Sequence, residues 1–309
     1  MITRSRIIAG PAYCKFGTTS WRSSGKVSSV PTLETISIKD PLSGTTRAIV
    51  KNRYWKSSHV PLYYDPTVTN PVFFPWLSVA ATRPGAEIFG ADTVFNALGN
   101  NGDTIGYTAA AVTKMPDLFL GVEKDFYASP IEFTGVNSTG ADFATESNLH
   151  TIQTGQSFTA PAVPGTSVLG RQKYTAVWGT YAGFTSFQGF AGFTITHELE
   201  LHPVTDNGQL IGYLFQSYRA MAKVVASANT MEQMVTAMVL AGTGAAQGQD
   251  ISAASADLVI SGASGVTATI KGAALVSGGF EFGPDTLRQG EIGFVSTNPA
   301  GTNAGLVLA

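Results

Sequence analysis

The stretch FTITHELELHPVTDNG, residues 193–208, decides the fold because a strand pattern and a turn pattern follow one another in it. Residues 193–201 alternate between apolar and polar side chains, which is the period of a half-buried β-strand. Asn207-Gly208 is a strong signal for a two-residue hairpin turn, and a second alternating run, residues 214–225, follows it. The sequence therefore predicts a long β-hairpin with one apolar face and one polar face.

The turn also predicts the register of this hairpin. With a two-residue turn, paired residues have numbers that sum to about 415. On the apolar face this rule places Leu199 opposite Gln216 and Leu201 opposite Leu214.

On the polar face the same rule places Glu198 opposite Ser217 and diagonal to Arg219. Such a diagonal lies within reach of a cross-strand ion pair worth under about 1 kcal/mol. Glu200 follows on the same face. We expect both glutamates to lie on the surface of the hairpin.

The segment HELELH within this stretch is not a zinc motif. The motif HExxH needs two histidines four residues apart on one helical face. His197 and His202 are five apart in a strand pattern, so their side chains point to opposite faces of the sheet. His59 and His150 have no carboxylate or cysteine at ligand spacing, and we expect both at the surface. We predict neither a metal nor a cofactor.

The composition indicates a protein that covers part of its surface by assembly. Only 13% of the 309 residues are charged, about half the usual fraction, and 44% are hydrophobic. A net charge of −2 argues against a basic nucleic-acid-binding surface. The single cysteine, Cys14, excludes an internal disulfide framework and a cysteine-based zinc site. The apolar runs are shorter than the roughly 18 residues of a membrane span, and we expect no membrane association.

We predict one elaborated, mainly β domain over residues 1–309, of the sandwich or barrel-like type with one flanking helix. The helix is expected at 229–242, where Thr230 and Gly242 supply the caps, and a weaker helical segment at 73–81. Residues 40–108, rich in aromatics, proline and asparagine, are expected to form a long ordered excursion, and residues 296–309 a C-terminal arm. Further strands are expected at 32–40, 128–136, 257–262, 266–276 and 288–297.

No pattern in the sequence meets the requirements of a catalytic site. There is no G-x-S-x-G, and GTGAAQGQD at 242–250 follows a predicted helix and lacks phosphate-loop spacing. The acidic residues are too scattered to nominate a catalytic pair. We predict that the protein is not an enzyme.

Four blocks of the chain resemble tail tube proteins of long-tailed, siphophage-like bacteriophages. They are IIAGPAYCKFGTTSW (7–21), the segment 109–136 around AAVTKMPDL, THELELHPVTDNGQLIGY (196–213), and the strands of 257–295. They occur in the order found in that family and cover about a third of the chain. The resemblance implies a tail tube fold and a structural virion protein, made in the host cytoplasm and located in the phage tail.

The resemblance also implies partners. The subunits would form hexameric rings that stack into a tube, next to the tape measure, tail terminator and distal tail proteins. DNA would pass through the channel during ejection without specific binding. Lys or Arg side chains in the channel would bind DNA phosphates and hold the duplex in place, so a neutral or acidic lining is expected. The candidate lumen-lining residues are Glu198 and Glu200.

A second reading remains open, in which the chain is a monomeric β-sandwich module that binds carbohydrate or another cell-surface ligand. Its basis is a group of aromatic residues that would form a sugar-stacking platform or, alternatively, pack locally or against a neighbouring subunit: Tyr54, Trp55, Tyr63, Tyr64, Phe73, Phe74 and Trp76.

Overall fold

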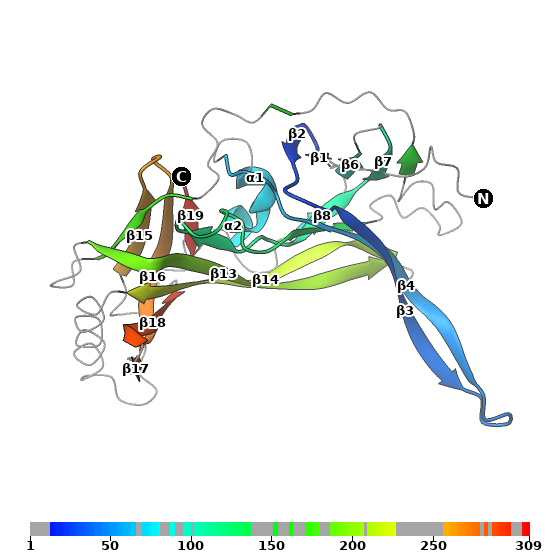
Figure 1. The fold of residues 1–309 in the computed structure, drawn as a ribbon. Coiled ribbons are helices and arrows are strands. Elements are labelled where there is room, and N and C mark those ends of the chain that lie inside the picture. The colour runs from blue at the N-terminus through cyan, green and yellow to red at the C-terminus, as the bar shows by residue number, and fades with distance from the viewer. Residues whose placement is uncertain are drawn as a thin grey trace.

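Figure 1 shows a computed structural model of the chain, which is built mainly from antiparallel β-strands, as the sequence predicts. The structure describes residues 13–65, 70–80, 87–89, 95–99, 102–136, 151–153, 161–162, 171–179, 186–206, 209–226, 256–278, 281–283, 286–297 and 305–309. The predicted helix at 229–242 and His150 lie outside these residues.

Six strands of the described chain close into a barrel. In hydrogen-bonded order they are β18 (Thr286–Ser296), β14 (Gln209–Ala226), β13 (Phe187–Asp206), β12 (Tyr174–Trp178), β15 (Ala256–Gly262) and β16 (Thr267–Ser277), and β16 pairs back to β18. Four short strands extend the edges, namely β5 (Glu87–Phe89) on β14, β9 (Leu118–Leu120) on β13, β17 (Glu281–Gly283) on β18 and β19 (Leu306–Leu308) on β16.

The β13–β14 hairpin carries the predicted turn and a register that the turn rule only partly predicts. Asp206 pairs with Gln209, as a two-residue turn requires. β14 then holds two extra residues, Ile211 and Gln216, at β-bulges. From Glu200 toward the start of β13, the register is therefore displaced by two residues from the predicted one. Two displacements of one residue return each side chain to its predicted face, because the side-chain period of a strand is two.

The displaced register corrects the predicted partners. Leu199 lies opposite Tyr218, not Gln216, and Leu201 lies opposite Phe215, not Leu214.

Two smaller sheets pack beside the barrel. One contains β3 (Ser28–Lys39), β4 (Thr46–His59), β10 (Ile131–Gly135) and β8 (Ala110–Lys114), and the other contains β11 (Thr151–Gln153), β7 (Thr104–Tyr107), β6 (Phe95–Leu98), β1 (Tyr13–Phe16) and β2 (Thr19–Arg22). Of two short helices, α2 (Pro75–Ala80) lies within the weaker helical segment predicted at 73–81, and α1 (Asn70–Phe73) precedes it. One cluster of buried apolar side chains includes residues of the barrel and of both sheets.

The aromatic residues for which the sequence leaves both a platform and local packing open are mostly in the core. Tyr63, Tyr64, Phe73, Phe74 and Trp76 are buried, and the indole of Trp76 donates to the Val112 carbonyl at 2.6 Å. Their role in the structure is therefore local packing.

The expectation of a surface position for His59 is wrong. β4 continues through this polar-looking stretch because β10 pairs with it, placing Ile131 opposite His59. The imidazole lies between aromatic rings, among them Trp21 and Phe133, and its Nε2 accepts a hydrogen bond from the Trp21 indole at 2.9 Å. Burial lowers the pKa of His59 to about 3, so the ring is neutral.

Candidate functional site

The polar face of the β13–β14 hairpin carries both candidate lumen residues. Glu198 lies directly opposite Arg219, one register step closer than the predicted diagonal, and the two side chains form an ion pair. The Nε of Arg219 donates to the Glu198 carboxylate at 2.8 Å. Glu200 accepts a hydrogen bond from Ser217 Oγ at 2.7 Å. All these side chains are exposed, so the structure places the two glutamates on one solvent-facing surface.

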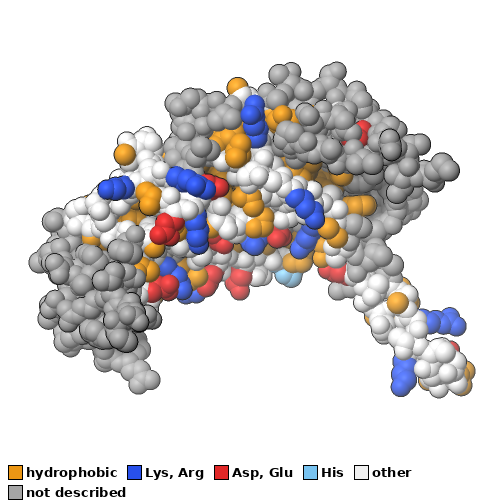
Figure 2. Space-filling view, viewed as in Figure 1, with side chains coloured by type: hydrophobic (Ala, Val, Ile, Leu, Met, Phe, Trp, Pro, Cys, Tyr) orange, Lys and Arg blue, Asp and Glu red, His pale blue; other side chains and the backbone are white. Residues whose placement is uncertain are grey.

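A second ion pair continues this surface onto β18. Lys223 of β14 lies 2.8 Å from the carboxylate of Glu291. Arg219 and Lys223 occupy alternate positions on the same strand and therefore the same face. Each of these two cations is thus matched by a glutamate. Figure 2 shows acidic and basic side chains intermixed along the lower side of the molecule in this view.

The two histidines of HELELH are separated, as predicted. His202 is exposed, whereas His197 is half-buried with its Nε2 out of contact with solvent, and its Nδ1 lies 2.8 Å from the hydroxyl of Tyr218. Its Nε2 has no partner among the described residues. Desolvation lowers the pKa of His197 to about 4, against the weaker opposing effect of the Asp117 carboxylate. This pair is a partly buried polar contact between β13 and β14.

The most exposed apolar surface belongs to a projecting arm, which we define as residues 34–52 of β3 and β4. Figure 1 shows the arm leaving the body of the protein, with its tip far from the barrel. Ile36 and Ile38 are alternate residues of β3 and share one face, and Ile49 of β4 lies opposite Ile36. Each of these three side chains is about half exposed. The arm therefore has an uncovered apolar face.

The turn at the end of the arm is well defined. The Asp40 carboxylate accepts hydrogen bonds from the Leu42 amide at 2.9 Å and from Ser43 Oγ at 2.8 Å. Gly44 takes a φ of +67°, which glycine adopts without strain. Leu42 stands at the apex with 98% of its surface exposed. We call residues 40–45 the arm tip.

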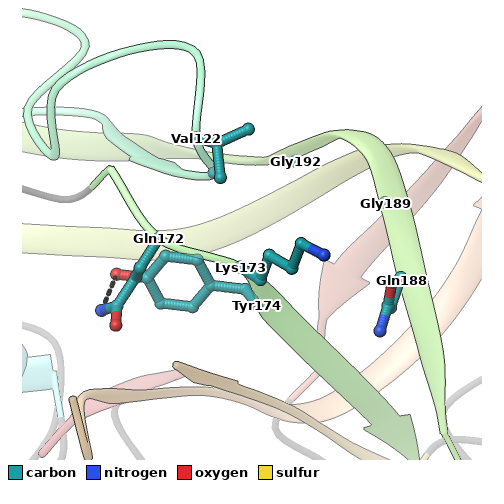
Figure 3. Close-up of a pocket in the computed structure, with 8 residues that line it drawn as sticks. Val122, Gln172, Lys173, Tyr174, Gln188, Gly189 and Gly192 are labelled. Carbon is teal, nitrogen blue, oxygen red and sulfur yellow. Dashed lines mark hydrogen bonds between the residues drawn. The ribbon is translucent and has the colours of Figure 1, made fainter. Parts of the chain in front are cut away.

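A pocket of about 310 Å³ opens where β12, the start of β13 and the residues after β9 meet. Its lining, which we call the barrel pocket, is Gly121, Val122, Gln172, Lys173, Tyr174, Gln188, Gly189 and Gly192 (Figure 3). The Gln172 side chain donates to Tyr174 Oη at 2.9 Å and to Ser264 Oγ at 2.7 Å, so this wall is held in place. The three glycines allow close packing of the backbone here, since a Cβ on any of them would lie within 3 Å of another protein atom.

Sequence reasoning missed both the arm and the pocket. Pro41 and Gly44 lie between two alternating runs, and this signal predicts a hairpin if the runs are read together. The pocket has no such signal, because its lining comes from three segments that only folding brings together.

Neither a metal cluster nor a membrane span is present in the part of the chain that the structure describes. No group of three or more His, Cys, Asp or Glu side chains there is arranged to hold an ion. No helix of these residues has the length and apolar character needed to cross a membrane. No known protein family and no curated protein sequence matches the chain.

Proposed function

We propose that this chain is a structural subunit that assembles with copies of itself, and that the assembly is a phage tail tube. The observation that carries self-assembly is the arm. A two-stranded ribbon is at best marginally stable alone in water, and three or more strands or a packed face are needed for stability. The strand β10 pairs with β4 only from His59 to Lys56. From there to the tip of the arm, β3 and β4 have no third strand beside them among the described residues. A neighbouring subunit would supply the missing cover.

The apolar residues of the arm support the same conclusion. Of the large hydrophobic side chains exposed in the described chain, five lie on β3, β4 or the turn between them: Val30, Ile36, Ile38, Leu42 and Ile49. Scattered exposed apolar residues are normal, but a contiguous set marks an interaction surface. The free outer edge of β3 adds backbone donors and acceptors for β-augmentation.

The tail tube part of the proposal rests on the resemblance of the four sequence blocks. It assigns the subunit to stacked hexameric rings in the virion, with tape measure, terminator and distal tail proteins as further partners and no catalytic role. The exposed face with Glu198 and Glu200 would line the channel. Its paired cations support this assignment, since ion-paired Arg219 and Lys223 are less available to DNA phosphates.

The experiment is negative-stain electron microscopy with light-scattering mass measurement over a concentration series. We expect rings or hollow tubes and a mass that rises with concentration. A variant with Asn-Gly in place of residues 35–51, which joins the paired residues Glu34 and Asn52, should stay monomeric and folded.

A finer comparison keeps the arm and changes one face at a time. Replacing the cross-strand pair Ile36 and Ile49 by threonine should weaken assembly at least tenfold, because apolar burial is lost while strand propensity is retained. The matched control, Ser37→Thr with Ala48→Thr, changes the pair on the opposite face and should assemble normally. A wild-type protein that remains monomeric at every concentration would contradict the proposal.

A further inference from the structure

We propose that the arm tip of one copy docks in the barrel pocket of the next copy, with Leu42 as the inserted side chain. This inference rests on the self-assembly proposed above and identifies the contact that joins successive subunits. It follows from the shape of the tip, the lining of the pocket, their charges and their positions at opposite ends of the molecule.

The arm tip presents Leu42 in a prearranged conformation. Hydrogen bonds from the Leu42 amide and Ser43 Oγ to the Asp40 carboxylate fix the turn, and the backbone bond from Asp40 N to Thr45 O at 2.8 Å closes it. A turn whose backbone is already held in its binding geometry loses little backbone entropy on docking. An apolar group with 98% of its surface in water also gains the most from burial.

The barrel pocket suits one or two inserted side chains. Its volume of about 310 Å³ lies at the small end of the range for ligand pockets. Val122, 51% exposed, supplies apolar surface at the rim. The glycine positions are close-packed toward the protein interior, since a Cβ on Gly192 would lie 2.7 Å from the Leu120 carbonyl oxygen. Glycine at this position therefore lets β13 lie close against the segment at Leu120, which forms one side of the pocket.

The arm tip and the pocket carry one pair of opposite charges, Asp40 and Lys173, while Lys39 and Arg47 lie behind the tip on β3 and β4. The hydrogen bonds from Leu42 and Ser43 lower the pKa of Asp40, so the tip carries a carboxylate beside Leu42. Lys173 lies at the pocket and forms no ion pair with another described residue (Figure 3). Docking would bring Asp40 and Lys173 together at the edge of the contact, where opposite charges favour the correct pairing of surfaces.

The two surfaces lie too far apart to meet within one subunit. Gly189 and Gly192 lie at the barrel end of β13. Leu210, at the other end of the hairpin, belongs to the cluster against which Tyr54, at the base of the arm, is packed. From Gly189 to Thr205 an extended strand covers roughly 50 Å. The arm points away from the barrel (Figure 1). A donor at one end and an acceptor at the other give head-to-tail contacts, which generate rings or open tubes.

The test is cysteine cross-linking between two singly substituted proteins. Leu42→Cys subunits are mixed with mass-tagged Val122→Cys subunits under assembly conditions and oxidised briefly. We expect a disulfide-linked mixed dimer as the major product, and a ladder of covalent oligomers from the Leu42→Cys, Val122→Cys double variant. The native Cys14 is buried, and burial raises its pKa, so it does not compete.

Val276→Cys is the matched control, because Val276 is also 51% exposed and lies on β16, away from the pocket. Mixed with Leu42→Cys, it should give no more product than random collision. Light-scattering mass measurement tests the contact without a cross-link. We expect Leu42→Ser to raise the dissociation constant of the assembly at least tenfold.

The outcomes separate the two proposals. Rings or tubes that form without a preferred disulfide between positions 42 and 122 would overturn the docking contact and leave self-assembly standing. Equal cross-linking to positions 122 and 276 would also overturn it. A chain that stays monomeric at every concentration would overturn both.

Discussion

The imidazole of His197 makes the stability of this protein depend on pH. Its ring is neutral in the folded chain, since desolvation lowers the pKa to about 4, whereas in the unfolded chain it returns to about 6.5. Between these values the unfolded state binds more protons, so the free energy of unfolding falls as the pH falls. The contribution of His197 to this loss is about 3 kcal/mol.

We therefore expect the urea midpoint to decrease steadily from pH 6.5 to pH 4, and a His197→Gln variant to show a smaller decrease. Tyr218→Phe is the paired control. It removes the hydroxyl that contacts Nδ1 and should cost about 1–3 kcal/mol at all pH values, while the slope with pH persists. Equal slopes for wild type and His197→Gln would contradict the assignment.

Gly192 is a second position where one residue determines local structure. Its φ is +99°, and a Cβ there would meet the Leu120 carbonyl oxygen at 2.7 Å. We expect Gly192→Ala to lower the free energy of unfolding by more than about 2 kcal/mol, from backbone strain and from the displacement of β9. Gly265→Ala isolates the first cause, because Gly265 has a φ of +86° with no atom near the added Cβ. Chemical denaturation of the two variants measures the difference, and equal losses would show that the clash is relieved at no cost.

At the scale of the residue, sequence reasoning succeeds where a pattern fixes the environment and fails where tertiary packing does. The separation of His197 from His202 follows from strand alternation alone. The burial of His59 does not follow from its polar neighbours, because it depends on β10 and on Trp21, which are distant in sequence.

At the scale of the element, the β13–β14 hairpin shows what a turn signal determines. Asn207-Gly208 predicts the pairing nearest the turn, and the alternation predicts the two faces. The bulges at Ile211 and Gln216 have no comparable local signal. A bulge bends its strand, and how much bending is needed depends on the closure of the whole barrel. The face of Glu198 was thus predictable, but its direct pairing with Arg219 was not.

The ion pairs of this face lead to an electrostatic prediction. Replacing Glu198 and Glu291 by glutamine removes the partners of Arg219 and Lys223 while changing stability by under about 1 kcal/mol per pair, because all four groups are exposed. If the face lines the channel, assembled tubes of this variant should retain duplex DNA that resists nuclease. Retention should fall steeply with salt, by a log–log slope of about −0.9 for each phosphate engaged.

Asp206→Asn is the control, since it removes an acidic charge from the same strand and leaves both ion pairs in place. Tubes of this variant should retain no more DNA than wild type. DNA that binds the double-glutamine variant but stays sensitive to nuclease would place the face on the outside of the tube.

At the scale of the whole molecule, the mainly β architecture was predictable, while closure of the barrel and projection of the arm were not. Alternating runs and turn residues identify strands, but which strands pair depends on contacts distant in sequence. The pairing of β16 with β18 closes the barrel, and no local pattern announces it. The low charged fraction favours a protein whose surface is partly buried in an assembly. The exposed apolar residues of the arm are the surface that such an assembly would bury.

The late position of β18 in the chain has a consequence for synthesis on the ribosome. β3 and β4 are joined by a short turn and can pair within microseconds of leaving the exit tunnel. The barrel cannot close until residues 286–296 have been translated, because β18 bridges β14 and β16. Throughout that interval a nascent chain exposes the apolar residues of a marginally stable ribbon and the open edges of the barrel strands. Crowded polysomes therefore favour premature association, and slower initiation or a chaperone that shields strand edges should raise the yield of correctly folded subunits.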